Sequence, residues 1–334
     1  MSPPARRPPV PERVRPQERG AALLTVLMLV AVIAVMAGTA LEKLRLSTRL
    51  AANAAATEQA RAFAVAAEAL AMVRVGDLLG RSPDRVSLLG GWSNRPFALP
   101  LPGGFATARV SDGTNCFNLN GLVGPVTPGV YADNATQRTQ FARLMRFVGI
   151  PGQVAEQVAA GATDWIDSDD VTLPAGAEDA RYTGQAVGYR TAGTLMADPS
   201  ELRAVSGVTP ELYATLRPWI CTLPVAAPAL INVNTLAPEQ APLVAMLAPD
   251  MLNPDAVAQA LLRRPPQGWG STGGFWQTPG LNPPGQPTGI AVKSQWFRLA
   301  IEVRTGDTTL EERALIDATR LPVRLVSRQW GEET

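Results

Sequence analysis

An uncharged apolar run at residues 21–41 constrains this chain more than any other part of its sequence. About 20 apolar residues in a helix are enough to span a bilayer, so the run predicts one transmembrane helix. The preceding residues 1–20 carry five arginines and two glutamates. Because positively charged flanks stay on the cytoplasmic side, we expect the N-terminus in the cytoplasm and the rest of the chain across the membrane.

The helical pattern continues beyond the apolar run to about residue 80 and contains no proline. In its second half, helical spacing relates Phe63, Ala67, Leu70 and either Val73 or Arg74, which predicts a face packed on a globular domain. We therefore expect a single helix over residues 21–80 that serves as both anchor and domain spine. A plain membrane anchor and a cleaved secretory signal, with its small residues at 38–40, are the alternatives.

Period-two patterns downstream predict an antiparallel sheet. The expected strands are residues 105–110, 114–119, 298–304, 310–318 and 321–327, the first two forming a hairpin. Helical patterns dominate residues 125–220, where Asp198-Pro199 and Thr209-Pro210 each predict a helix start. This order favours an α+β domain with a helical insertion over two tandem domains.

The composition excludes several function classes. A net charge of +1 leaves no basic surplus for binding a polyanion. The chain has no histidine, which removes the commonest general base near neutral pH and the commonest metal ligand. With two cysteines in the whole chain, a cysteine-based zinc site is excluded as well.

The residues around the start of the apolar run resemble a type IV prepilin leader. Arg19-Gly20 is followed by Ala21-Ala22-Leu23-Leu24-Thr25, and the resemblance implies cleavage by a prepilin peptidase between Gly20 and Ala21, with methylation of the new N-terminus. Two positions depart from the common pattern. Ala21 replaces the usual phenylalanine, and Thr25 replaces the usual glutamate at the fifth mature position.

Four further motifs sharpen this resemblance. They are FNLN at 117–120, DWIDSDD at 164–170 with GAED at 176–179, SELR at 200–203 with GVTPELY at 207–213, and INVNT at 231–235. Together with the leader they resemble the minor pseudopilin K (GspK) family of type II secretion systems, which typically lacks the fifth-position glutamate. The resemblance implies a pilin-like α+β fold, in which a long N-terminal helix packs on an antiparallel sheet interrupted by a mostly helical insertion.

The resemblance also implies a domain organisation. The expected parts are a cleaved leader at 1–20, a transmembrane and spine helix at 21–80, a pilin-like domain formed by 81–122 and 222–334, and a helical insertion at 123–221. The implied function is that of a non-enzymatic minor pseudopilin at the pseudopilus tip, which assists export of folded proteins across the outer membrane. The implied location is the inner membrane, with the C-terminal domain in the periplasm and minor pseudopilins I and J as partners.

Thr25 fits a tip position, because a carboxylate buried without a partner is costly and a tip subunit has no neighbour above it. The alternative function is a membrane-anchored DNA receptor, since residues 200–219 and 231–247 resemble helix-hairpin-helix modules. Arg203 and Arg217 are the only basic residues of the first module, too few for strong phosphate binding. We therefore expect no nucleic-acid partner.

Six carboxylates fall within sixteen residues of the predicted insertion: Asp164, Asp167, Asp169, Asp170, Glu178 and Asp179. Ca²⁺ takes six to eight oxygen ligands, often from such clusters. A solvated acidic loop or helix caps are the alternative. The family resemblance implies a structural Ca²⁺ site here, held by a subset of the six that the spacing does not identify.

Cys116 and Cys221 flank the predicted insertion, so its two ends must lie close together if it leaves and rejoins one sheet. In an oxidising compartment this placement predicts a disulfide, with two buried free thiols as the alternative. Residues 264–289 form a long loop rich in proline and glycine. Its aromatic residues, Trp269, Phe275 and Trp276, either form an exposed contact surface or fold back to hold the loop.

Overall fold

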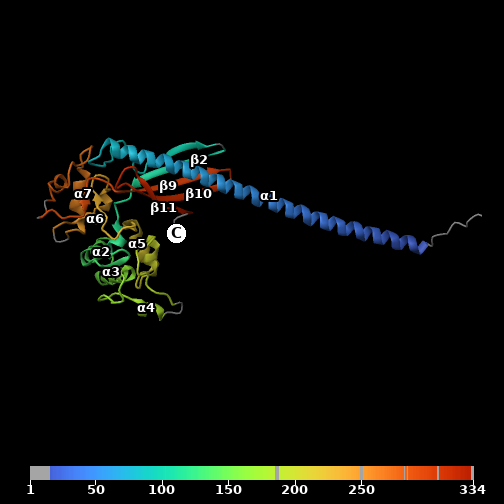
Figure 1. Cartoon of the computed structure of the whole chain (residues 1–334), viewed down its shortest axis with the longest axis horizontal. Helices are drawn as coiled ribbons and strands as arrows, with labels where there is room; N and C mark the ends of the chain where they lie inside the picture. Colours follow the sequence, from blue (N-terminus) through green and yellow to red (C-terminus); the bar gives the residue numbers. More distant parts are fainter. Residues whose placement is uncertain are drawn as a thin grey trace, which may run out of the picture. The chain divides into compact units, whose positions relative to one another are not determined.

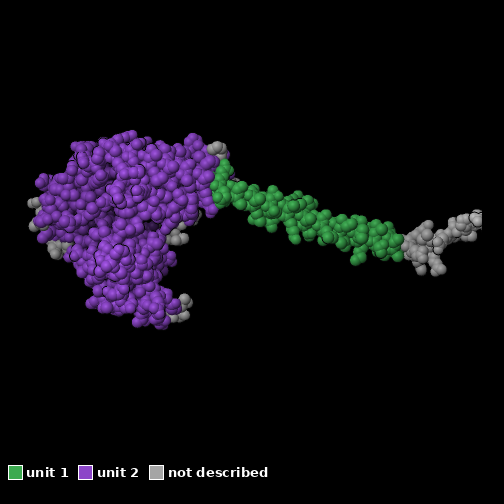
Figure 2. All heavy atoms as spheres, viewed as in Figure 1, with its two compact units in different colours: residues 1–59 green, residues 60–334 purple. Residues whose placement is uncertain are grey.

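The computed structural model of this chain describes residues 16–101, 103–184, 188–248, 251–281, 283, 285–306 and 308–331, with side chains from Gly20 onwards. Residues 1–15 of the predicted leader lie outside the described residues. The chain divides into two compact units, residues 1–59 and 60–334, which Figure 2 colours separately. The second unit contains both the sheet and most of the helices.

Helix α1 is continuous over Pro16–Arg81 and confirms the predicted long helix. It starts four residues before Gly20, because proline is well accommodated in the first turn of a helix. In the second unit its buried stripe differs from the predicted one. Small residues at helical spacing face the domain, whereas Val73 is 60% exposed. The stripe consists of Ala60, Ala64, Ala67, Ala71, Val75 and Leu79.

The helix packs on a five-stranded antiparallel sheet with strand order β1-β2-β9-β10-β11 (Figure 1). The strands are β1 Phe97–Leu101, β2 Gly104–Asp112, β9 Trp296–Thr305, β10 Thr308–Asp317 and β11 Arg324–Trp330. In β9 the side chains of Phe297, Leu299 and Ile301 are buried towards α1. The alternation predicted for this strand is therefore present, and residues 60–112 and 296–330 form what we call the sheet layer.

The predicted hairpin between residues 105–110 and 114–119 is wrong. Strand β2 instead pairs with β1 and β9, and residues 117–118 form β3, which pairs in parallel with β6 at Ile220–Cys221. The reason is local. The Asp112 carboxylate accepts hydrogen bonds from the backbone N–H and hydroxyl of Thr114, at 2.9 and 2.6 Å, and this turn directs the chain away from the sheet.

A short hairpin of β4 Val123–Thr127 and β5 Val130–Asp133 precedes the helices of the predicted insertion. The helical region then confirms both predicted helix starts. Asp198 caps the 3-10 helix η2, and Thr209 caps α5, each followed by proline. The helices up to this point are α2 Ala135–Phe147, α3 Gly152–Ile166, α4 Asp179–Thr183, η2 Pro199–Ala204, α5 Pro210–Leu216 and η3 Arg217–Trp219.

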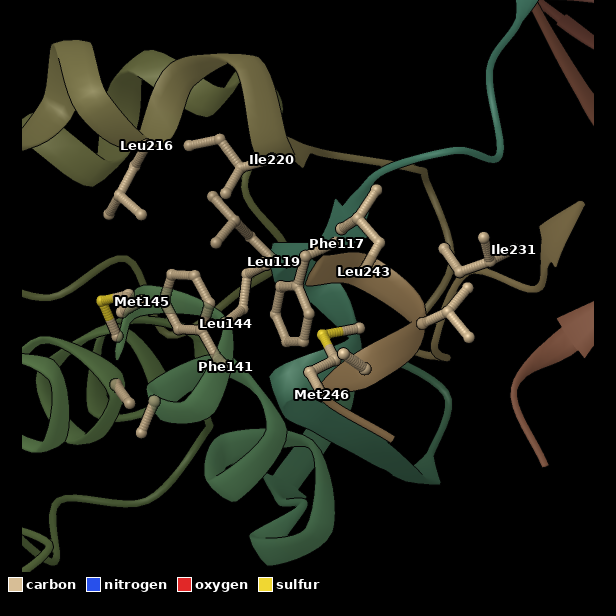
Figure 3. Close-up of a cluster of buried hydrophobic side chains, with 14 of the residues drawn as sticks. Phe117, Leu119, Phe141, Leu144, Met145, Leu216, Ile220, Ile231, Leu243 and Met246 are labelled. Carbon is tan, nitrogen blue, oxygen red and sulfur yellow. The ribbon is translucent and has the colours of Figure 1, made fainter. Parts of the chain in front are cut away.

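The chain beyond the predicted insertion boundary at residue 221 continues the same helical core. Leu243 and Met246 pack with Phe117, Leu119 and Phe141, side chains that come from both sides of that boundary (Figure 3). We call residues 115–291 the helical body. Its later elements are β7 Ile231–Asn232, η4 Pro238–Gln240, α6 Pro242–Ala245, α7 Pro254–Leu262, α8 Thr272–Trp276 and β8 Ile290–Ala291.

Candidate functional site

Three of the six predicted calcium carboxylates are buried around the end of α3. Asp164 lies in the last turn of this helix, Asp167 follows as its C-cap residue, and Glu178 is the residue before α4. Their exposed fractions are 0%, 3% and 5%. Buried carboxylates are normally paired with a cation, hydrogen-bonded or protonated, so the charge of this set requires compensation.

The electrostatics of the set support this interpretation. Burial, followed by the negative charges of Asp169 and Asp164, raises the pKa of Asp167 to about 7. Burial and the charge of Asp164 likewise raise the pKa of Glu178 to about 7. Asp167 Oδ1 and Glu178 Oε1 are buried and have no hydrogen-bond partner among the described residues. A bound cation would compensate both atoms.

The other three carboxylates are placed differently. Asp169 and Asp170 are exposed, and Asp179 forms an ion pair with Arg190 at 3.2 Å. Among the described residues, no group of three or more His, Cys, Asp or Glu side chains is already gathered in metal-binding geometry. The structure thus separates the six into a buried set of Asp164, Asp167 and Glu178 and an outer set.

A glycine fixes the loop that covers the buried set. The backbone N–H of Leu173 donates to both carboxylate oxygens of Asp164 at 3.3 Å. A Cβ atom at Gly176 would lie 2.0 Å from Asp164 Oδ2, so any other residue would displace the carboxylate or the loop. Sequence reasoning missed this role, although a glycine within a strongly acidic segment was a usable signal.

A disulfide closes the neck of the predicted insertion at residues 123–221. The structure joins Cys116 to Cys221, with Cα atoms 5.8 Å apart across a sequence separation of 105 residues. The adjoining strands β3 and β6 pair in parallel beside it. The two cysteines therefore hold together the segments that enter and leave residues 123–221.

The FNLN and INVNT motifs supply buried asparagines that hold loops in place. Asn118 donates to the carbonyl oxygens of Val225 and Ala227, at 3.1 and 2.8 Å, and accepts from the N–H of Leu223 at 2.8 Å. Asn234 donates to the carbonyl oxygen of Trp269 at 3.0 Å and accepts from its N–H at 2.7 Å. These motifs are structural, and they substitute for regular secondary structure in satisfying buried backbone groups.

The aromatic residues of the 264–289 loop fold inward. Trp269, Phe275 and Trp276 are 7%, 0% and 2% exposed, and their rings contact one another. Of the two alternatives for this loop, the structure favours aromatic side chains that hold it against the helical body. They provide no exposed contact surface.

The first unit consists of the start of α1 and carries the apolar segment. The helix from Gly20 is long and apolar enough to cross a membrane. Its apolar side chains are exposed within the chain, for example Leu24 at 70% and Met28 at 72%. The hydroxyl of Thr25 donates to the carbonyl oxygen of Ala22 at 2.9 Å, so the polar atom is satisfied within its own helix.

An apolar N-terminal helix that continues into the spine of an α+β sheet domain defines a pilin-like subunit with one candidate membrane anchor. Two family models described as type II secretion system (T2SS), protein K, match residues 115–225 and 231–293. The type II secretion system protein K of Pectobacterium carotovorum subsp. carotovorum is 34% identical, with 95% of this chain and 98% of the relative covered. The chain therefore belongs to the type II secretion system protein K family.

Further relatives agree. The type II secretion system protein K of Aeromonas hydrophila is 33% identical over 87% of this chain and 90% of the relative. A chain in the crystal structure of the GspK-GspI-GspJ complex from the enterotoxigenic Escherichia coli type 2 secretion system matches with a TM-score of 0.71 and 28% identity. That match covers 83% of this chain and 97% of the other, and confirms the predicted α+β fold. The DNA-receptor alternative finds no support in these matches.

Proposed function

We propose that this protein is a non-enzymatic minor pseudopilin that forms a complex with minor pseudopilins I and J at the tip of a type II secretion pseudopilus. The observation that carries the proposal is the similarity over nearly the full length of a chain solved within a GspK-GspI-GspJ complex. The size of the helical body supports a terminal position. Head-to-tail stacking requires a free face on every inner subunit, and residues 115–291 add a bulk that such a face would have to accommodate.

Thr25 also supports the terminal position. A carboxylate in the apolar surroundings of the bilayer or the fibre core needs a charged partner from a neighbouring subunit. The Thr25 hydroxyl is already bonded to the carbonyl oxygen of Ala22. This side chain therefore requires nothing from a subunit above it.

The partner-binding proposal is tested by size-exclusion chromatography with light scattering on the detergent-solubilised full chain mixed with I- and J-type pseudopilins. We expect a complex with one copy of each. Val65 and Val73 are 43% and 60% exposed on the second half of α1, where a helix partner would pack. Aspartate at both positions should weaken the complex about tenfold by placing charge in an apolar contact.

Leu262→Asp is the matched control, since Leu262 is 65% exposed on α7 and lies outside this helix face. It should leave complex formation unchanged. A wild-type chain that stays monomeric with both partners present would overturn the proposal.

We further propose that a prepilin peptidase cleaves after Gly20 and that α1 then anchors the mature protein in the inner membrane with its domain in the periplasm. The apolar helix that begins at Gly20 supports this arrangement. Intact-mass measurement of the membrane-extracted protein should give a chain that starts at Ala21. A chain that starts near Leu41 would instead indicate a secretory signal, and an uncut Met1 would indicate a plain anchor.

Finally, we propose that the buried carboxylates hold a structural calcium ion. Asp167 and Glu178 each supply a buried oxygen atom that has no hydrogen-bond partner in the part of the chain that the structure describes, and Asp164 lies in the same set. Asp169 and Asp170 are exposed beside it and are available to complete the oxygen shell. When bound, the ion would neutralise repulsion between these groups and fix the loop over 167–178 to α3.

A further inference from the structure

A cavity of about 520 Å³ lies between the outer face of the sheet, which points away from α1, and residues 197–199 and 217–223 of the helical body. Its lining contains four arginines and one aspartate, so the formal charge of the lining is +3. These residues are Arg109, Arg217, Arg298, Arg313 and Asp198. The proposed contact through α1 does not use this cavity.

The strand register explains why the arginines converge. Ala300 in the middle strand β9 lies opposite Arg109 of β2 on one side and Arg313 of β10 on the other. The small alanine leaves open space between two long cationic side chains. Two residues earlier on β9, Arg298 lies opposite Ser111 of β2 and Leu315 of β10, which carry no charge.

The positive charge is poorly compensated within the chain. Arg109 and Arg298 have no hydrogen-bond or ion-pair partner among the described residues, while Arg217 and Arg313 have contacts of their own. Burial, and next the positive charge of Arg217, lowers the pKa of Arg298. The guanidinium groups of Arg298 and Arg217 therefore repel one another, and a bound anion would relieve this repulsion.

Asp198 and Glu302, two carboxylates near the cavity, are already engaged. Asp198 accepts hydrogen bonds from the N–H of Ser200 at 2.9 Å and from the side-chain amide of Gln329 at 3.1 Å. Glu302 lies on the same face of the sheet but outside the cavity, and it pairs with Arg304. A carboxylate that enters the cavity would thus meet the guanidinium groups of Arg109 and Arg298, whose planar donor pattern matches carboxylate geometry.

We propose that this cavity binds an acidic segment of a partner protein, with two or more aspartate or glutamate side chains placed on Arg109 and Arg298. The volume is in the range of peptide- or cofactor-sized sites and is too large for a single small anion. Pro199, Pro218 and Ile220 add apolar surface to the lining, which suits the aliphatic parts of a peptide. The inference goes beyond the proposed function, because it needs neither minor pseudopilin I nor J.

The test is fluorescence anisotropy of a labelled peptide of about eight residues with alternating glycine and glutamate, added to the full chain in non-ionic detergent. We expect binding that weakens as salt is raised. The double variant Arg109→Gln with Arg298→Gln should weaken binding by about tenfold or more. Arg109→Gln alone should weaken it in the same direction, and since Arg109 is exposed, this single variant keeps the fold if Arg298→Gln does not.

Arg324→Gln is the matched control, because Arg324 is an exposed arginine on β11 outside the cavity lining. It should leave the affinity unchanged within about twofold. Three results would overturn the proposal: equal weakening by Arg324→Gln, equal binding of the same peptide with glutamine in place of glutamate, or no binding. Displacement of the peptide by inorganic phosphate at equal concentration would also overturn it, since the cavity would then be a small-anion site.

Discussion

The sheet layer and the helical body bury different kinds of side chain. In the sheet layer the contacts between α1 and the strands are almost all apolar, and the principal buried polar feature is Glu68 and Glu312 beside Arg328. The helical body buries carboxylates and asparagines besides its apolar core, and it contains a disulfide. The sheet layer therefore depends mainly on the hydrophobic effect, whereas the helical body depends on oxidation, on polar partners and, under our proposal, on a cation.

The largest expected effect is removal of the disulfide. Serine at both Cys116 and Cys221 should lower the free energy of unfolding by about 4 kcal/mol, because a crosslink across this many residues restricts the unfolded chain. Urea denaturation followed by tryptophan fluorescence measures the loss, which we expect first in the helical body. Reductant should reproduce it in the wild type and change nothing in the double variant. Two free thiols on labelling of the denatured, unreduced protein would exclude the bridge.

Calcium should have the next largest effect. At about one hundred times its dissociation constant, a ligand specific for the folded state stabilises it by roughly 3 kcal/mol, so we expect that gain over chelated protein. Asp167→Asn should abolish the gain. The same variant should stabilise the calcium-free protein, because it removes a carboxylate whose pKa is raised to about 7.

Asp179→Asn is the control for the calcium experiment, since Asp179 is already paired with Arg190. It should retain the response to calcium. A melting transition that is identical in excess chelator and excess calcium would contradict the site.

Asn118→Ala should lower stability by about 2–3 kcal/mol, because it leaves two partly buried carbonyl groups and one buried N–H without their partner. Chemical denaturation of the variant gives the value. The control is Asn253→Ala, which removes a helix cap on α7 and should cost about 1 kcal/mol. Equal losses in the two variants would mean that the buried asparagines do not hold the helical body together.

The smallest effect concerns the buried ion pairs of Arg328 with Glu68 and Glu312 in the sheet layer. Burial, and next the hydrogen bond and charge of Glu68, raises the pKa of Glu312 from 4.5 to about 7. The folded state therefore binds more protons than the unfolded state between these values, and its stability falls as pH rises from 4.5 to 7. Glu312→Gln should reduce this loss of stability by about 2 kcal/mol, measured as unfolding free energies at both ends of the window with calcium present. Glu311→Gln, on the same strand, should keep the slope, and an unchanged slope in Glu312→Gln would refute the assignment.

The difference between the sheet layer and the helical body also explains which elements could be predicted from the sequence. The long helix and the strands β2, β9 and β10 follow from periodicity, because each has a repeating apolar face. The stripe on α1 was predicted only in part, since Ala67 is buried as expected but close packing against the sheet buries further alanines more fully than Phe63. The helical body was harder to predict, because its short segments are fixed by contacts far apart in sequence, such as Asn118 with Val225.

The candidate calcium site could likewise be predicted only in part from the sequence. The acidic residues were visible as a cluster, but the spacing could not distinguish the buried set from the outer set. Burial of Asp164 depends on how Gly176 and Leu173 fold over it, which is a tertiary contact. The arginine-lined cavity was not visible at all, because Arg109, Arg298 and Arg313 meet only through the pairing of β2, β9 and β10.

The central claim is the position of this subunit at the filament tip, and the most direct measurement is its location on assembled pseudopili. An epitope attached after Trp330, detected by gold-labelled antibody in electron micrographs, reports that location. We predict one label per filament, at one end only. Labels distributed along the filament would contradict the account, because every inner subunit would then accommodate the helical body.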